Sequence, residues 1–152
     1  MAREDVEYFA YGPDLAAATW GVPTEPALLR FHRLALAPAV RGSEPALSLV
    51  PDPEGEVPGL VFRLSFAEFG RVLNLADFSW SRRLERVTVT APGDQVLSVV
   101  TSFLNIGIRP WVVPREHAAR LRALYHDRGV NTFALEGALA RAAECVAEGG
   151  AQ

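Results

Sequence analysis

Residues 8–15 read Tyr8-Phe9-Ala10-Tyr11-Gly12-Pro13-Asp14-Leu15, and this stretch is the most informative part of the chain. It joins an apolar strand, predicted over 6–11, to a polar turn and then to a short helix predicted over 14–20. The first N–H groups of a helix have no partner within the helix, and a glycine lets a ligand approach the backbone closely. We therefore expect the turn around Gly12 to hold the anionic group of a small molecule.

The elements that follow this turn are mostly strands. Pro23 and Pro26 bracket a predicted loop. Strands are predicted over 28–39, 46–50 and 57–64, and the segment Pro51-Asp52-Pro53-Glu54-Gly55 is predicted as a turn between the last two. Strands over 82–90 and 96–103 are joined by a hairpin connection at 91–95.

Three further helices are indicated by their caps. Ser65-Phe66-Ala67-Glu68 has the spacing of a capping box and opens a helix that ends near Ala76. Pro114 opens the next helix, and Gly129 is placed as its C′ residue. Asn131 caps the last one. The apolar faces predicted for these helices are Phe66, Phe69, Val72 and Leu73 in the first, Leu121, Leu124 and Tyr125 in the second, and Phe133, Leu135, Leu139 and Ala142 in the third.

The order of these elements predicts an α+β fold, because strands come in runs and helices are segregated. A length of 152 residues fits one domain, and we expect a single domain over 1–152 with loose termini at 1–5 and 148–152. Hydrophobic residues make up 49% of the chain and charged residues 22%, as is typical of a globular protein.

The motifs at the turn and beyond resemble a known family. The turn is similar to the Tyr-Phe-Ala-Tyr-Gly-Ser-Asn-Leu signature of the γ-glutamylcyclotransferase-like (AIG2-like) family, with Pro13 in place of serine and Asp14 in place of asparagine. The segments 26–34 and 57–64 resemble two of its strands. The resemblance implies a small antiparallel, barrel-like β-sheet with flanking helices.

The resemblance also implies a site. Tyr11, Gly12, Pro13, Asp14 and Leu15 would form its substrate-binding turn. The family carries its catalytic glutamate in a Leu-Asp-x-x-Glu-Gly segment. Here the segment reads Leu73-Asn74-Leu75-Ala76-Asp77-Phe78, which puts Asp77 at the glutamate position.

The implied activity is the cyclisation of a γ-glutamyl amine or peptide to 5-oxoproline, with release of the amine. The substrate's own α-amine attacks the γ-carbonyl, so one carboxylate is enough to move the protons. Asp77 would be that acid/base, and no metal or organic cofactor is needed. The alternative is a catalytically degenerate relative that binds a small carboxylate metabolite or a protein partner. Aspartate is one methylene shorter than glutamate, and a displacement of about 1 Å in a catalytic group costs on the order of a hundredfold in rate, so Asp77 would work poorly or not at all in this reaction.

Each site residue also has a structural interpretation. Asp14 fits the N-cap of the helix that follows it, and this interpretation is favoured over ligand binding. Asp77 fits an exposed loop carboxylate equally well. Arg82, Arg83 and Arg86 form a basic cluster that we expect to be a solvated strand edge without function.

The remaining features exclude several classes of partner. A net charge of −3 argues against nucleic-acid binding. His32, His117 and His126 lack metal-ligand spacing. No apolar run reaches the length of a membrane span, and no signal peptide is evident, so we expect a cytoplasmic protein. We also expect a bacterial source, and the resemblance implies a small γ-glutamyl or carboxylate ligand as the partner. The sequence does not indicate an oligomeric state.

Overall fold

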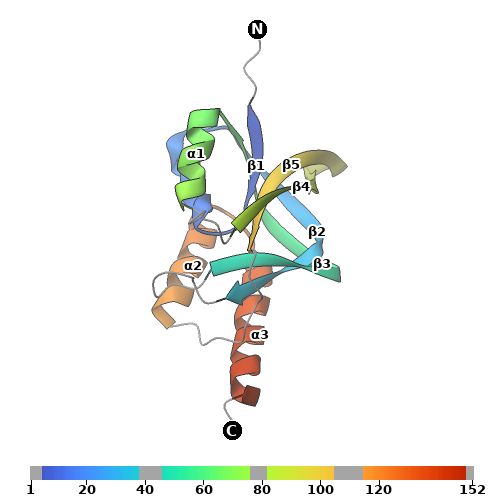
Figure 1. Ribbon diagram of the computed structural model, residues 1–152, viewed down its shortest axis with the longest axis vertical. Coiled ribbons are helices and arrows are strands. Elements are labelled where there is room, and N and C mark those ends of the chain that lie inside the picture. The colour runs from blue at the N-terminus through green and yellow to red at the C-terminus, as the bar shows by residue number, and fades with distance from the viewer. Residues whose placement is uncertain (1–4, 38–45, 76–81, 105–114, 150–152) are drawn as a thin grey trace.

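The computed structural model describes residues 5–37, 46–75, 82–104 and 115–149. Over these residues the strands close into a barrel in the order β1-β3-β2-β4-β5. Figure 1 shows α1 and α2 on one side of the barrel, while α3 leads away from it toward the C-terminus. The α+β class and the barrel-like sheet with flanking helices are confirmed. The strands are β1 (Val6–Ala10), β2 (Thr24–Ala37), β3 (Ala46–Leu64), β4 (Arg82–Ala91) and β5 (Gln95–Leu104), and the helices are η1 (Pro13–Trp20), α1 (Phe66–Leu75), η2 (Pro92–Asp94), α2 (Arg115–Asp127) and α3 (Phe133–Gly149), with η1 and η2 of the 3-10 type.

The barrel is antiparallel except where it closes. β1 pairs with β3, β3 with β2 and β4 with β5 over long antiparallel ladders. β1 meets β5 in a parallel pair at Tyr8 and Val100. β2 and β4 join at Leu28 and Thr90, so this seam is narrow.

One glycine sets how closely β1 and β3 approach at the end of β1. A Cβ added to Gly59 would lie 2.4 Å from the Ala10 carbonyl oxygen and 2.7 Å from the Phe9 ring. A side chain therefore does not fit there, which explains the glycine within the motif segment 57–64. This contact fixes the end of β1, and hence the start of the Tyr11–Gly12 turn.

The predicted turn at 51–55 is wrong, because β3 runs through it from Ala46 to Leu64. Pairing with β2 keeps the segment extended: Pro51 pairs with His32, and Glu56 pairs with Arg30. The turn-forming residues of this segment form a bulge in the strand instead, where Asp52 Oδ1 accepts a hydrogen bond from the Glu54 N–H at 3.0 Å.

The predicted loop between Pro23 and Pro26 is also wrong, since β2 begins at Thr24. The Pro23 carbonyl accepts a hydrogen bond from the Arg63 N–H at 3.0 Å, and Pro26 pairs with Leu60. Long-range pairing with β3 thus overrides the proline signals.

The local signals at the helix ends are confirmed. Ser65 and Glu68 form the predicted capping box, with hydrogen bonds of 2.9 Å from the Ser65 N–H to Glu68 Oε1 and 3.2 Å from the Glu68 N–H to Ser65 Oγ. Asn131 Oδ1 accepts the N–H of Phe133, the first residue of α3, at 2.9 Å. Two predicted core positions, Phe66 and Phe133, are instead exposed. Both stand at the first residue of a helix, where the side chain points away from the packed face.

Helix α2 ends in a Schellman motif. The Gly129 N–H donates to the His126 carbonyl at 3.1 Å, and the Val130 N–H donates to the Tyr125 carbonyl at 2.9 Å. Gly129 has a φ of +70°, as its predicted C′ position requires. This motif fixes the last turn of α2, which carries the buried Tyr125.

Candidate functional site

Two backbone donors of the turn after β1 are used within the turn itself. Gly12 precedes η1, and its carbonyl accepts the Leu15 N–H at 2.9 Å. The Gly12 N–H donates to Asp14 Oδ1 at 3.0 Å. Pro13 has no N–H to offer. Gly12, Pro13 and Leu15 therefore have no free N–H group for an external anion.

Asp14 is not the predicted N-cap of η1. Gly12 occupies the N-cap position, no side chain caps it, and Asp14 lies inside the helix. Its carboxylate is only 2% exposed and turns back toward the strand, where Oδ2 accepts a hydrogen bond from the Tyr8 hydroxyl at 2.5 Å. The Asp14 carboxylate bonds to Tyr8 rather than capping the helix, because the buried hydroxyl offers it a charge-assisted hydrogen bond away from water.

The Tyr8 hydroxyl stays protonated in this setting. Burial raises its pKa well above the usual value, and the negative charge of Asp14 raises it further. The same hydroxyl lies 3.4 Å from Ser102 Oγ on β5. Tyr8 and Asp14 therefore form a buried donor–acceptor pair that joins β1, η1 and β5.

The other two tyrosines of the chain meet at the same place. The Tyr11 hydroxyl donates to the Ser102 carbonyl at 2.5 Å, and the Tyr125 hydroxyl of α2 donates to the Tyr11 carbonyl. Burial, followed by the charge of Asp14, raises the pKa of Tyr125. All three tyrosines of the sequence thus surround the turn. Sequence reasoning missed Tyr8 as the partner of Asp14. It also missed Ser102 and Tyr125 as partners of Tyr11, because they come from elements far from the turn in the chain.

A cavity of about 600 Å³ lies beside this cluster. The Phe69 ring of α1 lines it and also packs on Tyr8, with ring centroids 5.8 Å apart. Phe69 therefore stands between the cavity and the tyrosine–aspartate pair. The residues that line the cavity are Asp5, Val6, Glu7, Phe69, Leu84, Glu85, Arg86, Ser98 and Val100.

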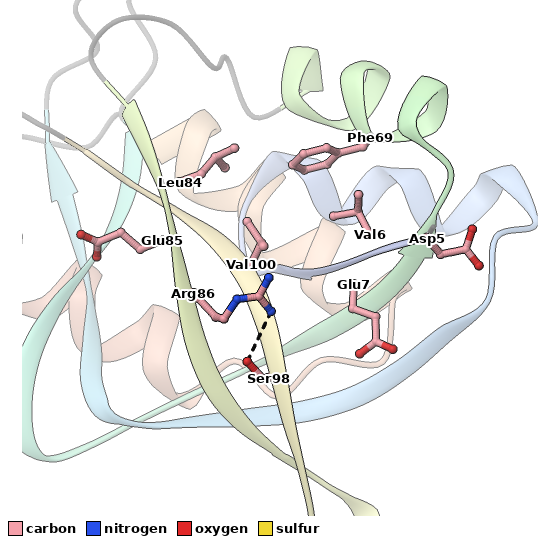
Figure 2. Close-up of a pocket in the computed structure, with 9 residues that line it drawn as sticks. All are labelled: Asp5, Val6, Glu7, Phe69, Leu84, Glu85, Arg86, Ser98 and Val100. Atoms are coloured by element: carbon pink, nitrogen blue, oxygen red, sulfur yellow. Dashed lines mark hydrogen bonds between the residues drawn. The ribbon is translucent and has the colours of Figure 1, made fainter. Parts of the chain in front are cut away.

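The cavity has an apolar part and a polar part. Figure 2 shows the side chains of Val6, Phe69, Leu84 and Val100 gathered together, with the Arg86 guanidinium below them. Arg86 Nη1 lies 3.4 Å from Ser98 Oγ, the contact drawn as a dashed line. This mixture of apolar walls with a few polar groups is typical of small-molecule sites, and so is the volume.

The charges in the cavity are partly neutralised by ion pairs. Glu7 is paired with Arg63 at 3.4 Å, and Glu85 is paired with Arg83 at 3.0 Å. Among the residues that the structure describes, neither Asp5 nor Arg86 has an ion-pair partner. The lining thus includes one carboxylate, that of Asp5, and one guanidinium, that of Arg86, without an ion-pair partner among the described residues.

The predicted site residues are only partly brought together. Tyr11, Gly12, Asp14 and Leu15 are buried and Pro13 is exposed. Asp77 lies outside the described residues. The segment that carries it connects α1 to β4, two elements that line the cavity. The resemblance implies that Asp77 and residues 11–15 border one pocket, and this stays a prediction.

Two general features of the described part of the chain bear on its partners. No group of three or more His, Cys, Asp or Glu side chains there is arranged to hold a metal ion. None of the helices there has both the length and the apolar character needed to cross a membrane.

Comparisons with known proteins identify the fold. A solved γ-glutamyl cyclotransferase superimposes with a TM-score of 0.69 at 14% identity, over 83% of this chain and 81% of the other. A γ-glutamyl cyclotransferase specific to glutathione, from yeast, gives 0.57 at 14% identity over 91% and 99%. An AIG2-like protein from mouse gives 0.52 at 13% identity over 76% and 88%. No family model matches the sequence. No curated protein matches it.

Proposed function

We propose, on the premise that this chain has the fold of the γ-glutamyl cyclotransferases, that it binds a small amino-acid-type carboxylate and does not convert it to 5-oxoproline. The ligand occupies the cavity between α1, β4 and β5. Its carboxylate pairs with Arg86 and Ser98, its amine faces Asp5, and its apolar part packs on Phe69 and Leu84.

One observation carries this proposal. The Gly12 N–H, the donor that would hold a substrate carboxylate at the turn, already donates to Asp14 of the same chain. Because Asp14 is buried beside that N–H, a second carboxylate there would meet both a filled position and a like charge. The carboxylate subsite therefore moves away from the turn to the guanidinium of Arg86, which gives this residue a role that its place in an exposed basic cluster did not predict.

Cyclotransfer by Asp77 is the second candidate function, and the fold shared with named cyclotransferases favours it. In that reaction the α-amine nitrogen of the substrate forms a bond to the γ-carbonyl carbon, and the bond to the leaving amine breaks. Asp77 would accept the proton from the attacking amine and return one to the departing amine. The two candidates differ in whether 5-oxoproline appears.

The test is an assay of the purified protein against a panel of γ-glutamyl amino acids and amines. Binding is read as a rise in melting temperature or by calorimetry, and turnover is read as 5-oxoproline released. We expect saturable binding without product. Arg86→Gln should weaken binding by about tenfold or more, because a hydrogen bond to a charged group is lost. Arg115→Gln, which removes an exposed arginine on a different element, α2, is the matched control and should leave binding unchanged.

The variant Asp77→Asn separates the two candidates. Under the binding proposal it leaves both readouts unchanged. Release of 5-oxoproline by the unaltered protein, lost in Asp77→Asn with binding retained, would establish the cyclotransferase instead.

A further inference from the structure

Phe31 interrupts β2 with a left-handed backbone. Its φ is +66°. The ladder with β3 shifts at this point: Arg30 pairs with Glu56 and His32 with Pro51, so Phe31 alone stands opposite residues 52–55. A left-handed backbone is unfavourable for a residue that has a Cβ, and glycine or asparagine is the usual occupant.

The bulge also turns the Phe31 ring outward. Leu29 and Leu34 are both buried although they lie five positions apart, whereas an uninterrupted strand would point them to opposite faces. The bulge reverses the alternation between them, and the Phe31 side chain is left 65% exposed. The barrel needs a bulge here but not an aromatic ring, since glycine would serve without strain or exposed apolar surface.

The exposed ring borders a second cavity, of about 470 Å³, at the seam between β2 and β4. The two strands pair at Leu28 and Thr90, and the cavity is lined by residues that follow Leu28 on β2 and precede Thr90 on β4. None of residues 11–15 lines it. The lining residues are Leu29, Arg30, Phe31, His32, Leu49, Pro51, Arg83, Glu85, Arg86, Val87, Thr88 and Phe103.

Aromatic rings and positive charge are combined in this cavity. Arg83 stands over the Phe103 ring, with its guanidinium carbon 5.1 Å from the ring centroid, and it is paired with Glu85. The His32 ring lies 6.0 Å from that of Phe103. Arg30 has no ion pair with any carboxylate in the described part of the chain. In a chain of net charge −3, this lining holds three arginines against one glutamate.

We infer that the seam cavity is a second ligand site, which takes a small planar aromatic compound carrying a phosphate or a carboxylate. The ring of the ligand stacks on the exposed face of Phe31, and its anionic group pairs with Arg30. Stacking on an aromatic side chain and pairing with a guanidinium are the two interactions that this set of residues supplies. The volume fits a ligand of one fused ring system with a short charged arm. The two cavities share Glu85 and Arg86 of β4 in their linings, but the groups used here, Phe31 and Arg30, line the seam cavity and not the cavity beside α1.

The test uses four probes in calorimetric titrations of the full chain. Adenosine 5′-monophosphate carries the ring and a phosphate, and indole-3-acetate carries a ring and a carboxylate. Adenosine and ribose 5-phosphate each carry one half of the first probe. We expect adenosine 5′-monophosphate or indole-3-acetate, the two complete probes, to bind saturably. If adenosine 5′-monophosphate binds, adenosine and ribose 5-phosphate should each bind at least tenfold more weakly than it does. The tighter of the two complete probes identifies the anionic group. Failure of both to bind would overturn the inference.

The decisive variant is Phe31→Gly, which should move stability and binding in opposite directions. Removing the strained, exposed ring should raise the melting temperature by roughly 2–4 °C. It should also weaken probe binding by about tenfold, because the stacking surface is lost. Phe66→Ala, which removes a ring exposed to a similar extent (67%) at the start of α1, is the matched control and should leave binding unchanged.

Arg30→Gln tests the anionic half of the site. It should weaken the binding of whichever complete probe binds by about tenfold and leave the affinity for adenosine unchanged. A Phe31→Gly protein that melts below the original, or that binds the probe with unchanged affinity, would show that Phe31 has a structural role only.

Discussion

At the scale of single residues, Asp14 is the centre of the account. Its carboxylate occupies the turn and accepts hydrogen bonds from the Tyr8 hydroxyl and the Gly12 N–H. A buried donor left without an acceptor costs about 1–3 kcal/mol. Asp14→Ala leaves the Gly12 N–H without its acceptor and leaves the Tyr8 hydroxyl only the weaker contact with Ser102 Oγ at 3.4 Å, so we expect it to lower the free energy of unfolding by roughly 3 kcal/mol in urea denaturation.

Asp52→Ala is the control for this change. Asp52 also accepts a backbone N–H two residues away, that of Glu54, but at a water-accessible position. Its loss should cost at most about 1 kcal/mol, because water replaces the missing acceptor. Equal costs for Asp14→Ala and Asp52→Ala would contradict the buried role of Asp14.

The tyrosines predict how stability depends on pH. The pKa values of Tyr8 and Tyr125 are raised in the folded state, mainly by burial. The neutral form of each is therefore favoured by folding, and stability is fully present below the unfolded pKa of about 10. Above that pH the unfolded chain releases these protons while the folded chain keeps them, so stability falls by about 1.4 kcal/mol per pH unit for each tyrosine.

Urea denaturation between pH 9 and 11.5 measures this slope. The original protein should lose about 2.7 kcal/mol per pH unit above pH 10 from these two groups. Tyr125→Phe should show about half of that slope. A stability that is flat across this range would mean that both hydroxyls ionise freely in the folded protein.

At the scale of elements, the end of α2 positions the site. The Schellman motif at Gly129 fixes the turn that carries Tyr125, whose hydroxyl holds the Tyr11 carbonyl. Because Gly129 has a φ of +70°, Gly129→Ala should lower the free energy of unfolding by about 1 kcal/mol.

Gly70→Ala is the opposite case and serves as the matched control. Gly70 lies within α1, and an added Cβ there would meet no atom within 4 Å. Alanine has the better helix propensity, so this change should raise the free energy of unfolding by up to about 1 kcal/mol. A thermal or urea denaturation series of the two variants checks both signs, and the same sign for both would contradict the assignment of Gly129 as C′.

The elements also show how far the sequence predicts this molecule. The capping box at Ser65, the β4–β5 hairpin and the glycine end of α2 depend on neighbouring residues, and all three are confirmed. The continuous β3 was not predicted, because its passage through 51–55 depends on pairing with β2. Turn chemistry in the local sequence can serve a bulge as well as a chain reversal.

The candidate site was predictable in outline only. The turn around Gly12 was placed correctly after β1, since a strand and a glycine mark it. The N-cap position predicted for Asp14 is wrong, because the carboxylate accepts the Tyr8 hydroxyl instead of a backbone N–H within the helix. No pattern along the chain indicates that Ser102 and Tyr125 come to the same turn.

At the scale of the whole molecule, the barrel carries two candidate regions, whose linings share Glu85 and Arg86 of β4. One is the side covered by α1 and η1, where the cavity meets the buried tyrosines. The other is the narrow seam between β2 and β4, where Phe31 and Arg30 are exposed. The shared fold accounts for the scaffold, while the residues at these two places decide what binds.

Asp14 fills the turn, and we propose that a ligand binds in the cavity beside it. The decisive experiment is titration of the 15N-labelled protein with γ-glutamylalanine, followed through its assigned backbone amide signals. We expect saturable shifts at Phe69, Leu84 and Val100, with the Gly12 amide signal unmoved. A saturable shift of the Gly12 amide, with the three cavity signals unmoved, would contradict this proposal.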